Sequence, residues 1–307
     1  MNDNRTNDWL AAGRHDVERF VHDEFYETLP TSHDRAALVA ADRATYVLHQ
    51  TVTYNYARPV SDLRQRLIVV PREMHGDQQR VAHRFRVRTP GSKRVRQRTD
   101  KFGNAVVHVS VPAIERTIEF HTRAVMVRNR ATEHAAPWGS EATSTTPLTT
   151  PDYEIREAAR SLGPVRDVFD TADAISELVN TSFEYERGAT SVRTTASEAW
   201  ALKRGVCQDM AHVMIAMCST LGISARYVSG HLVGDGASHA WTEVFDQSRG
   251  TVIAIDPTHR RRTDLRYITT ATGNDYHDVA PTTGTYTGQG SRGMLTVDKV
   301  VRLVEVD

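Results

Sequence analysis

The sequence has few of the features that mark exported, membrane-spanning or strongly charged proteins. Its 38 lysines and arginines equal its 38 aspartates and glutamates, so the formal net charge is zero. A balanced charge gives no overall electrostatic reason to expect a nucleic acid or a membrane as a partner. No apolar run approaches the ~20 residues that cross a bilayer, and residues 1–30 carry charges throughout, without an apolar signal segment. We therefore expect a cytoplasmic protein with no nucleic-acid partner and no membrane partner.

Cysteine is also scarce. The two cysteines, Cys207 and Cys218, lie 11 positions apart (218 − 207) within one predicted helix. A rise of ~1.5 Å per residue separates their Cα atoms by roughly 16 Å, whereas a disulfide needs about 4.4–6.8 Å. Both thiols are therefore expected to stay unpaired, as is usual in a reducing compartment. Because the sequence also lacks the CxxC and HExxH patterns of redox and zinc sites, we expect neither a metal nor an organic cofactor.

The length of 307 residues exceeds the size at which one core usually stops growing, so two domains are expected. After residue 44 the apolar residues alternate with period two, which predicts an antiparallel β domain with strands at 45–57, 63–70, 81–88, 104–112 and 117–128. Residues 131–150 are dense in Ala, Ser, Thr and Pro, as in a linker. Beyond them helical patterns come first and strand patterns second, which predicts an α+β layout.

The predicted domains are a polar N-terminal extension at 1–44, a β-rich domain at 45–130, a linker at 131–150 and a core with C-terminal strands at 151–307. Within the extension, the apolar residues at 17, 20, 21 and 25 follow helical spacing. The basic segment Arg84–Arg98 surrounds a Thr-Pro-Gly turn signal. Its alternating apolar residues favour the two solvated arms of a β-hairpin over a nucleic-acid site.

The stretch around Cys207 predicts a helix with one buried face. Apolar residues recur from Met210 to Leu221 at helical spacing, and Gly222 then ends the pattern. Cys207 falls in the first turn, where the positive end of the helix dipole stabilises the nucleophilic thiolate form of a cysteine. The alternative is that Cys207 is a small core residue, which is the usual role of a lone buried cysteine. Cys218 lies on the apolar face and is expected in the core.

Two strands downstream bring a histidine close to a carboxylate. Residues 239–245 and 251–256 predict a hairpin joined by the polar turn 246–250. Pairing residue 246 with 251 places Trp241 opposite Asp256 and makes His239 the diagonal neighbour of Asp256 on the same face, at roughly 7–8 Å between backbones. Taken singly, His239 is an ordinary surface or core histidine and Asp256, before Pro257, an ordinary turn residue. Together with Cys207 they form a candidate Cys-His-Asp triad.

Four segments resemble the transglutaminase-like superfamily, whose members keep Cys, His and Asp in this chain order: GVCQDMAH around Cys207, ARYVSGHL at 225–232, SHAWTEVF at 238–245 and IDPTH at 255–259. Residues 53–128 look like the β-rich N-terminal domain of bacterial members, and 273–288 resemble their C-terminal segment, with Asn274 where the family pattern has Arg. The resemblance implies an N-terminal antiparallel β domain followed by a papain-like or transglutaminase-like core, with helices packed on an antiparallel sheet.

The resemblance also implies catalytic roles: Cys207 as nucleophile, His239 as general acid and base, and Asp256 as the orienting carboxylate. The expected reaction is thiol-dependent acyl transfer on peptide or protein carboxamides through a thioester, of the transglutaminase or cysteine peptidase/amidase type. An amine acceptor would give a crosslink and water would give hydrolysis; no residue of the sequence decides between them. The backbone N–H of Cys207 is a candidate oxyanion donor. The alternative is a non-catalytic protein-binding module that keeps the fold.

Overall fold

A computed structural model describes residues 21, 35–131, 133–134, 145–234, 237–288 and 292–307. The helical spacing expected near residues 17–25 falls almost wholly outside these residues. The chain divides into two units. The first comprises Met1–Arg130, Val233–Gly236 and Pro281–Asp307, and the second comprises Ala131–Leu232 and Ala237–Ala280. None of the helices within the described residues is both long enough and apolar enough to cross a bilayer.

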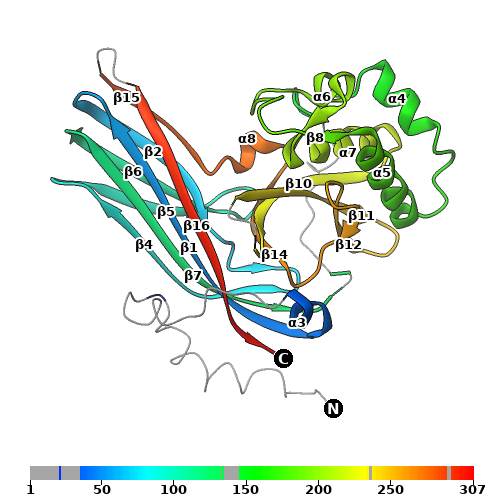
Figure 1. Ribbon diagram of the computed structural model, residues 1–307, viewed down its shortest axis with the longest axis horizontal. Coiled ribbons are helices and arrows are strands. Elements are labelled where there is room, and N and C mark those ends of the chain that lie inside the picture. The colour runs from blue at the N-terminus through cyan, green and yellow to red at the C-terminus, as the bar shows by residue number, and fades with distance from the viewer. Residues whose placement is uncertain (1–20, 22–34, 132, 135–144, 235–236, 289–291) are drawn as a thin grey trace. The chain divides into compact units, whose positions relative to one another are not determined.

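The first unit is built from two antiparallel sheets (Figure 1). One sheet has the strand order β16-β1-β7-β4-β3 and consists of β1 (Arg43–Tyr56), β3 (Met74–His75), β4 (Gln78–Arg88), β7 (Thr117–Asn129) and β16 (Gly293–Val306). The other has the order β15-β2-β6-β5 and consists of β2 (Val60–Val70), β5 (Arg94–Thr99), β6 (Ala105–Ile114) and β15 (Thr282–Thr287). A short helix, α3 (Arg35–Ala40), precedes β1.

Alternate residues of the two sheets point inward and form one core. Leu63, Leu67 and Val109 of the second sheet pack in the same buried cluster as Val52 and Phe120 of the first. This is the result expected of strands whose apolar residues recur with period two, since such strands bury one face. The five strands predicted for this region are all present.

One expectation for this unit was wrong. The segment Arg84–Arg98 does not form a hairpin, because β4 pairs with β7 in one sheet whereas β5 pairs with β6 in the other. The Thr-Pro-Gly turn therefore crosses between sheets. The pattern could not reveal this, because every residue of β5 is exposed and the strand has no buried face to set its partner.

The C-terminal strands also differ from the prediction, which grouped residues 151–307 in one core. Strand β16 pairs with β1 along its whole length, from Ala44 opposite Val306 to Tyr56 opposite Gly293, and β15 pairs with β2. Both strands therefore belong to the first unit. Pairing between strands separated by more than 200 residues leaves no local pattern in a sequence.

The second unit has its helices first and its sheet second, as predicted. The helices are α4 (Tyr153–Arg160), α5 (Val168–Ser182), α6 (Ala196–Leu202) and α7 (Cys207–Thr220), with the short parallel pair β8 (Glu184–Tyr185) and β9 (Arg204–Gly205) between them. The antiparallel sheet has the order β13-β12-β11-β10-β14. Its strands are β10 (Ser224–Leu232), β11 (Ser238–Asp246), β12 (Thr251–Asp256), β13 (Arg261–Arg262) and β14 (Tyr267–Gly273), and α8 (Tyr276–Val279) follows. Helix α7 packs between the other helices and strands β10 and β11.

Candidate active site

Helix α7 begins at Cys207, as the sequence predicts. The preceding residue, Val206, has an extended backbone, and Cys207 opens the helix with 9% of its surface exposed. The first N–H groups of a helix have no partner within the helix, so their positive ends gather around this thiol. At the other end Gly222 adopts a φ of +73°, which is the left-handed conformation that commonly ends a helix. Cys218 is fully buried in mid-helix, and burial raises the pKa of its thiol to about 12.

Asp209 fixes the backbone at the start of α7. Its Oδ2 accepts a hydrogen bond from the Val206 N–H at 2.8 Å and another from the Thr190 hydroxyl at 2.6 Å. Gly205 leaves room for this carboxylate, because a Cβ at that position would lie 2.6 Å from Oδ2. Burial raises the pKa of Asp209 despite these bonds. The sequence does contain a signal for this role: Asp209 lies three residues after the N-cap, where an acidic side chain commonly bonds back to the N-cap backbone.

The hairpin of β11 and β12 has the register that the turn length predicts. Asp246 pairs with Thr251 and Thr242 pairs with Ile255. Continued by one residue, this register puts the side chain of Asp256 on the same face of the sheet as that of His239. The side chains meet there, with His239 Nε2 2.7 Å from Asp256 Oδ2. His239 is 6% exposed and Asp256 is completely buried. The structure therefore brings together the histidine and the carboxylate that were expected to face each other.

The ring of His239 also interacts with the Cys207 thiol. Burial alone would lower the pKa of His239, but its hydrogen bond to Asp256 and its interactions with Cys207 outweigh burial and raise the pKa to about 10. Burial likewise disfavours the charged form of Asp256, yet the hydrogen bonds from His239 and His259 hold the pKa of this carboxyl well below its usual range. The site thus favours a histidine that carries a proton beside an ionised aspartate.

Two side chains that sequence reasoning missed also contact Asp256. His259 Nδ1 lies 2.7 Å from Oδ2, and the Tyr267 hydroxyl donates to the same oxygen at 2.7 Å. Oδ1 accepts the backbone N–H groups of Thr258 and His259, at 2.8 and 3.3 Å. The carboxylate is held at both oxygens, so it has little freedom to turn away from His239. The signal for His259 was its place three residues after Asp256, within a turn that the aspartate itself closes.

Helix α5 supports the same turn from the other side. The Asn180 side-chain amide donates to the carbonyl oxygens of Pro257 and Thr258, both at 2.9 Å. These bonds satisfy two backbone acceptors and anchor the end of β12 to a helix. Asn180 is therefore a positioning residue for Asp256, although nothing in its sequence context distinguishes it from other helix residues.

Aromatic rings pack around His239. Its ring centroid lies 6.2 Å from that of Trp241, and Trp241 packs edge-on against Tyr267 with centroids 5.4 Å apart. Gly230, paired with His239 on β10, is required by this packing because a Cβ there would collide with the Trp241 ring and the Ile268 carbonyl oxygen. The rings exclude water from one side of the site and restrict the histidine to one orientation.

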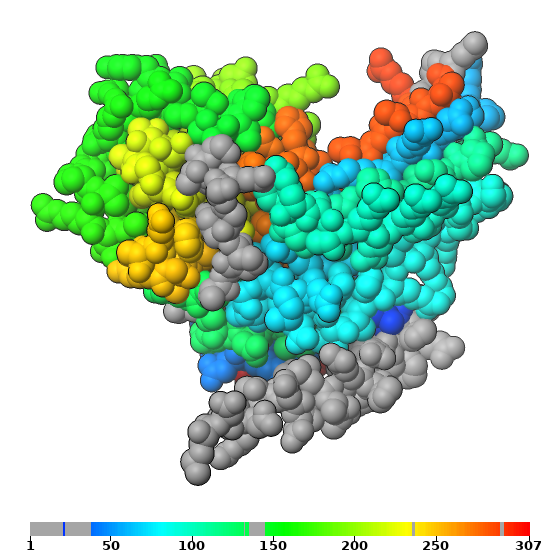
Figure 2. Space-filling model, turned by 180° about the vertical axis from the view of Figure 1, so that it is seen from behind, coloured from blue at the N-terminus to red at the C-terminus, as the bar shows by residue number. Residues whose placement is uncertain are grey.

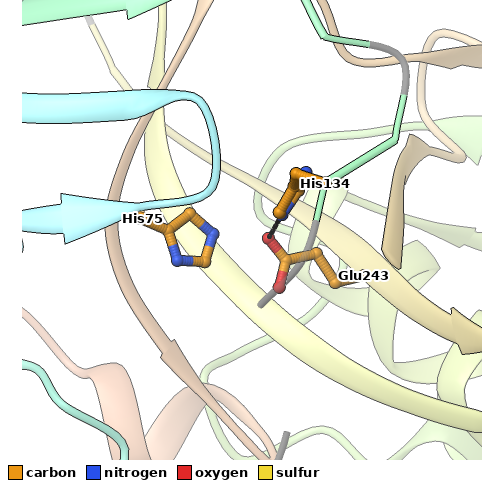
Figure 3. A group of neighbouring side chains, drawn as sticks. All are labelled: His75, His134 and Glu243. Carbon is orange, nitrogen blue, oxygen red and sulfur yellow. Dashed lines mark ion pairs between the residues drawn. The ribbon is translucent and has the colours of Figure 1, made fainter. Parts of the chain in front are cut away.

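Two groups of side chains in this unit deserve comparison as metal ligands. His239, Asp256 and His259 offer ligand atoms within 4.8 Å of one another, but these atoms already satisfy each other as hydrogen-bond partners. His134 and Glu243 also approach, with Nε2 3.9 Å from Oε1 (Figure 3). Arg226 neutralises that glutamate by an ion pair of 2.7 Å. Neither arrangement leaves an uncompensated charge for a cation.

Other polar and aromatic side chains of this unit differ in their surroundings. His212 Nε2 accepts the Tyr276 N–H at 3.2 Å, and burial lowers the pKa of His212 to about 4. Trp200 is buried against Phe183, with ring centroids 6.1 Å apart, whereas Tyr185 is 49% exposed. Asn274, which stands where an arginine was expected, donates its backbone N–H to Asp278 at 2.9 Å.

Models of two protein families match this chain. The transglutaminase-like superfamily matches residues 156–257, and the bacterial transglutaminase-like N-terminal region matches residues 46–127. The uncharacterized proteins Mb2599c of Mycobacterium bovis and Rv2569c of Mycobacterium tuberculosis are each 30% identical to it over 280 residues, which cover 79% of this chain and 85% of each relative. The chain belongs to the transglutaminase-like superfamily.

A solved structure supports the same fold for this transglutaminase-like chain. A protein of Cytophaga hutchinsonii, described as a "putative cysteine protease", superimposes with a TM-score of 0.71 and 20% sequence identity, covering 87% of this chain and 93% of its own. The predicted fold class, an N-terminal antiparallel β domain before a transglutaminase-like α+β core, is confirmed. The matched core ends at residue 257, directly after Asp256, so it contains Cys207, His239 and Asp256.

Proposed function

We propose that this transglutaminase-like protein catalyses thiol-dependent acyl transfer on peptide or protein carboxamides, with Cys207, His239 and Asp256 as its catalytic residues. The observation that carries the proposal is the His239 ring, which hydrogen-bonds the carboxylate at the end of β12 at 2.7 Å and interacts with the thiol at the start of α7. A nucleophile, a base and a group that orients the base form the arrangement expected of a cysteine acyltransferase or peptidase.

The reaction begins with Cys207 as a thiolate whose proton resides on His239. The sulfur attacks the carbonyl carbon of a carboxamide, and a C–S bond forms as the carbonyl electrons move to oxygen. His239 then gives its proton to the leaving nitrogen, the C–N bond breaks, and ammonia or an amine departs from a thioester. The raised pKa of His239 favours the protonated start of this step.

The second half of the reaction reverses the roles. The acceptor, an amine or water, loses a proton to His239 as it attacks the thioester carbon, and the C–S bond breaks to restore the thiolate. Asp256 stays ionised and keeps Nε2 of the ring engaged, so that the other ring nitrogen serves the sulfur and the acceptor. The backbone N–H of Cys207 is the proposed donor to the oxyanion, since it lies in the first turn of α7.

Alkylation by iodoacetamide near pH 6 tests whether Cys207 is a poised nucleophile. We expect rapid modification of Cys207 and almost none of Cys218, because burial raises the pKa of the Cys218 thiol to about 12. Mass spectrometry of the two cysteine peptides gives both rates from one sample. Equally slow labelling of both thiols would instead favour a protein-binding module that keeps the fold without turnover.

A glutamine-containing peptide with a labelled primary amine tests the reaction itself. Covalent incorporation of the amine identifies a transferase, and release of ammonia or new peptide termini without incorporation identifies a hydrolase. Cys207→Ala must abolish either product, while Cys218→Ala serves as the matched control and must retain it. Product formation by Cys207→Ala would refute the proposed nucleophile.

A further inference from the structure

The outer face of the sheet β15-β2-β6-β5 is strongly basic. Residues of β2 and β6 with odd numbers, such as Leu63 and Val109, point into the core. Residues with even numbers therefore point outward, and among them Arg64, His108 and Ser110 are exposed. The face lies within the first unit. The segment around residue 100, turquoise in Figure 2, lies at the molecular surface.

The strand register arranges these outward residues in rows across the sheet. Ser110 of β6 pairs with Arg94 on one side and Arg64 on the other, and His108 pairs with Arg96 and Arg66 in the next row. Residues directly opposite each other share a face of the sheet. The outer face thus carries a set that we call the basic face: Arg64, Arg66, Arg94, Arg96 and Arg98.

The basic face carries more positive charge than the two carboxylates beside it, Asp62 and Asp100, can offset. Arg66 lies 3.8 Å from Asp100. Within the part of the chain that the structure describes, Arg64, Arg94, Arg96 and Arg98 form no ion pair. A chain with zero net charge therefore concentrates positive charge on one side of one sheet. Such a concentration attracts anionic partners over a range of about a Debye length.

Three hollows indent this surface and share its arginines. One of about 660 Å³ is lined by Arg64, Lys93 and Arg94 together with Asp62, and another of about 290 Å³ by Arg94, Arg96 and Arg98. The third, of about 500 Å³, lies over the rows of β2, β6 and β15. Of the residues that the structure describes, no Phe, Tyr or Trp lines any of the three. Single-stranded nucleic acids usually bind basic surfaces that also stack their bases on aromatic rings, so this surface is poorly suited to them.

Among the described strands, β5 is an edge of its sheet, because β6 is its only neighbour in the strand order. All six of its residues are exposed. Arginines on an edge strand are a common protection against aggregation. That explanation does not account for Arg64 and Arg66, which lie on the interior strand β2. A binding role accounts for both the edge and the interior arginines.

We infer that the basic face docks an extended acidic segment of a polypeptide, which adds to β5 as a further strand. Every second side chain of such a segment lies on the outer face at a spacing of about 6.6 Å, the spacing of Arg94, Arg96 and Arg98 along β5. Glutamates or aspartates at alternate positions thereby meet successive arginines, while the peptide backbone pairs with the open edge. This docking goes beyond the proposed chemistry and does not depend on Cys207.

Fluorescence anisotropy with the full-length protein tests the inference. The probe is a short labelled peptide of alternating glutamate and threonine, and the comparison peptide has the same composition with its glutamates in one block. We expect the alternating peptide to bind more tightly, with an affinity that falls as salt rises. The variant Arg94→Gln/Arg96→Gln/Arg98→Gln should weaken binding about tenfold, because it removes several ion pairs with the peptide, each of which contributes modestly to affinity.

A matched variant controls for the loss of charge. Arg156, Arg160 and Arg166 are exposed arginines of the second unit, and replacing all three with glutamine should leave peptide affinity unchanged. Equal binding by the β5 variant and the unmodified protein overturns the inference, as does an equal loss in the control. Equal affinity for the comparison peptide, whose glutamates form one block, overturns the inference that the bound segment adds to β5 as a strand. Tighter binding of an oligothymidylate or of phosphatidylserine vesicles overturns the assignment to a polypeptide. Because only binding is measured, these outcomes are independent of whether the protein turns over a carboxamide.

Discussion

Replacing Asp256 with asparagine tests how the charge state of the site is maintained. The pKa of about 10 for His239, against an ordinary value near 6.5, corresponds to about 5 kcal/mol of preference for the imidazolium. Among the contributions that raise this pKa, the hydrogen bond that His239 donates to Asp256 is the largest. Asparagine has the same shape but no charge, so burial should then dominate and push the pKa of His239 below its ordinary value.

The expected readout is the rate at which iodoacetamide modifies Cys207 at pH 6.5. Iodoacetamide alkylates the thiolate form of a cysteine, which a neighbouring imidazolium stabilises. Asp256→Asn should therefore be labelled at least about tenfold more slowly than the unmodified protein, the usual effect of losing a close opposite charge. Cys218 serves as an internal reference, since unfolding of the variant would expose it and label both cysteines alike.

Asp246→Asn is the matched control for this prediction. Asp246 ends the same strand as His239, is also buried, and bonds Ser248 and Arg249 rather than the histidine. Labelling of Cys207 should be unchanged in this variant. A folded Asp256→Asn protein labelled within about threefold of the unmodified rate would refute the electrostatic account of the site.

Three further predictions concern the support of the site, and urea unfolding measures each one. Asn180→Ala removes two hydrogen bonds to the turn after β12 and should cost about 2 kcal/mol, whereas Thr181→Ala, which loses only bonds within α5, should cost less. Gly230→Ala should cost about 2 kcal/mol or more by overpacking, with Ser229→Ala near neutral; equal losses would contradict the packing argument. Burial lowers the pKa of His212 to about 4 from 6.5. The contribution of the neutral His212 ring to the free energy of unfolding is therefore complete above pH 6.5 and is lost as the pH falls from 6.5 through 4. That loss is on the order of 3 kcal/mol, so His212→Gln should remove this part of the acid sensitivity.

Local patterns predicted the elements that carry the site. The helical spacing after Cys207 and the turn between β11 and β12 are both short-range features, and each determines where its side chains point. Because a one-residue slip would reverse every side chain of a strand, the observed register leaves His239 and Asp256 on one face. The catalytic roles of these residues stay proposals until the labelling and turnover experiments are done.

Other features had no local signal. His259 and Tyr267 reach Asp256 only because a turn and a neighbouring strand fold back over it, and Asn180 approaches the same turn from a helix about 77 residues earlier. Strand β5 lacks an apolar face, so alternation could not identify its partner. Contacts of this kind depend on the three-dimensional path of the chain, which a single sequence does not reveal.

The pairing of β16 with β1 has a consequence for biosynthesis. The N-terminal β domain cannot acquire its last two strands until the ribosome has made residues 282–306, by which time the whole second unit has been synthesised. Pairing across so long a stretch of chain is intrinsically slow, since a large loop must close before the contacts form. Until then β1 and β2 present open edges, so the nascent chain should be most vulnerable to aggregation and most dependent on chaperones at this stage.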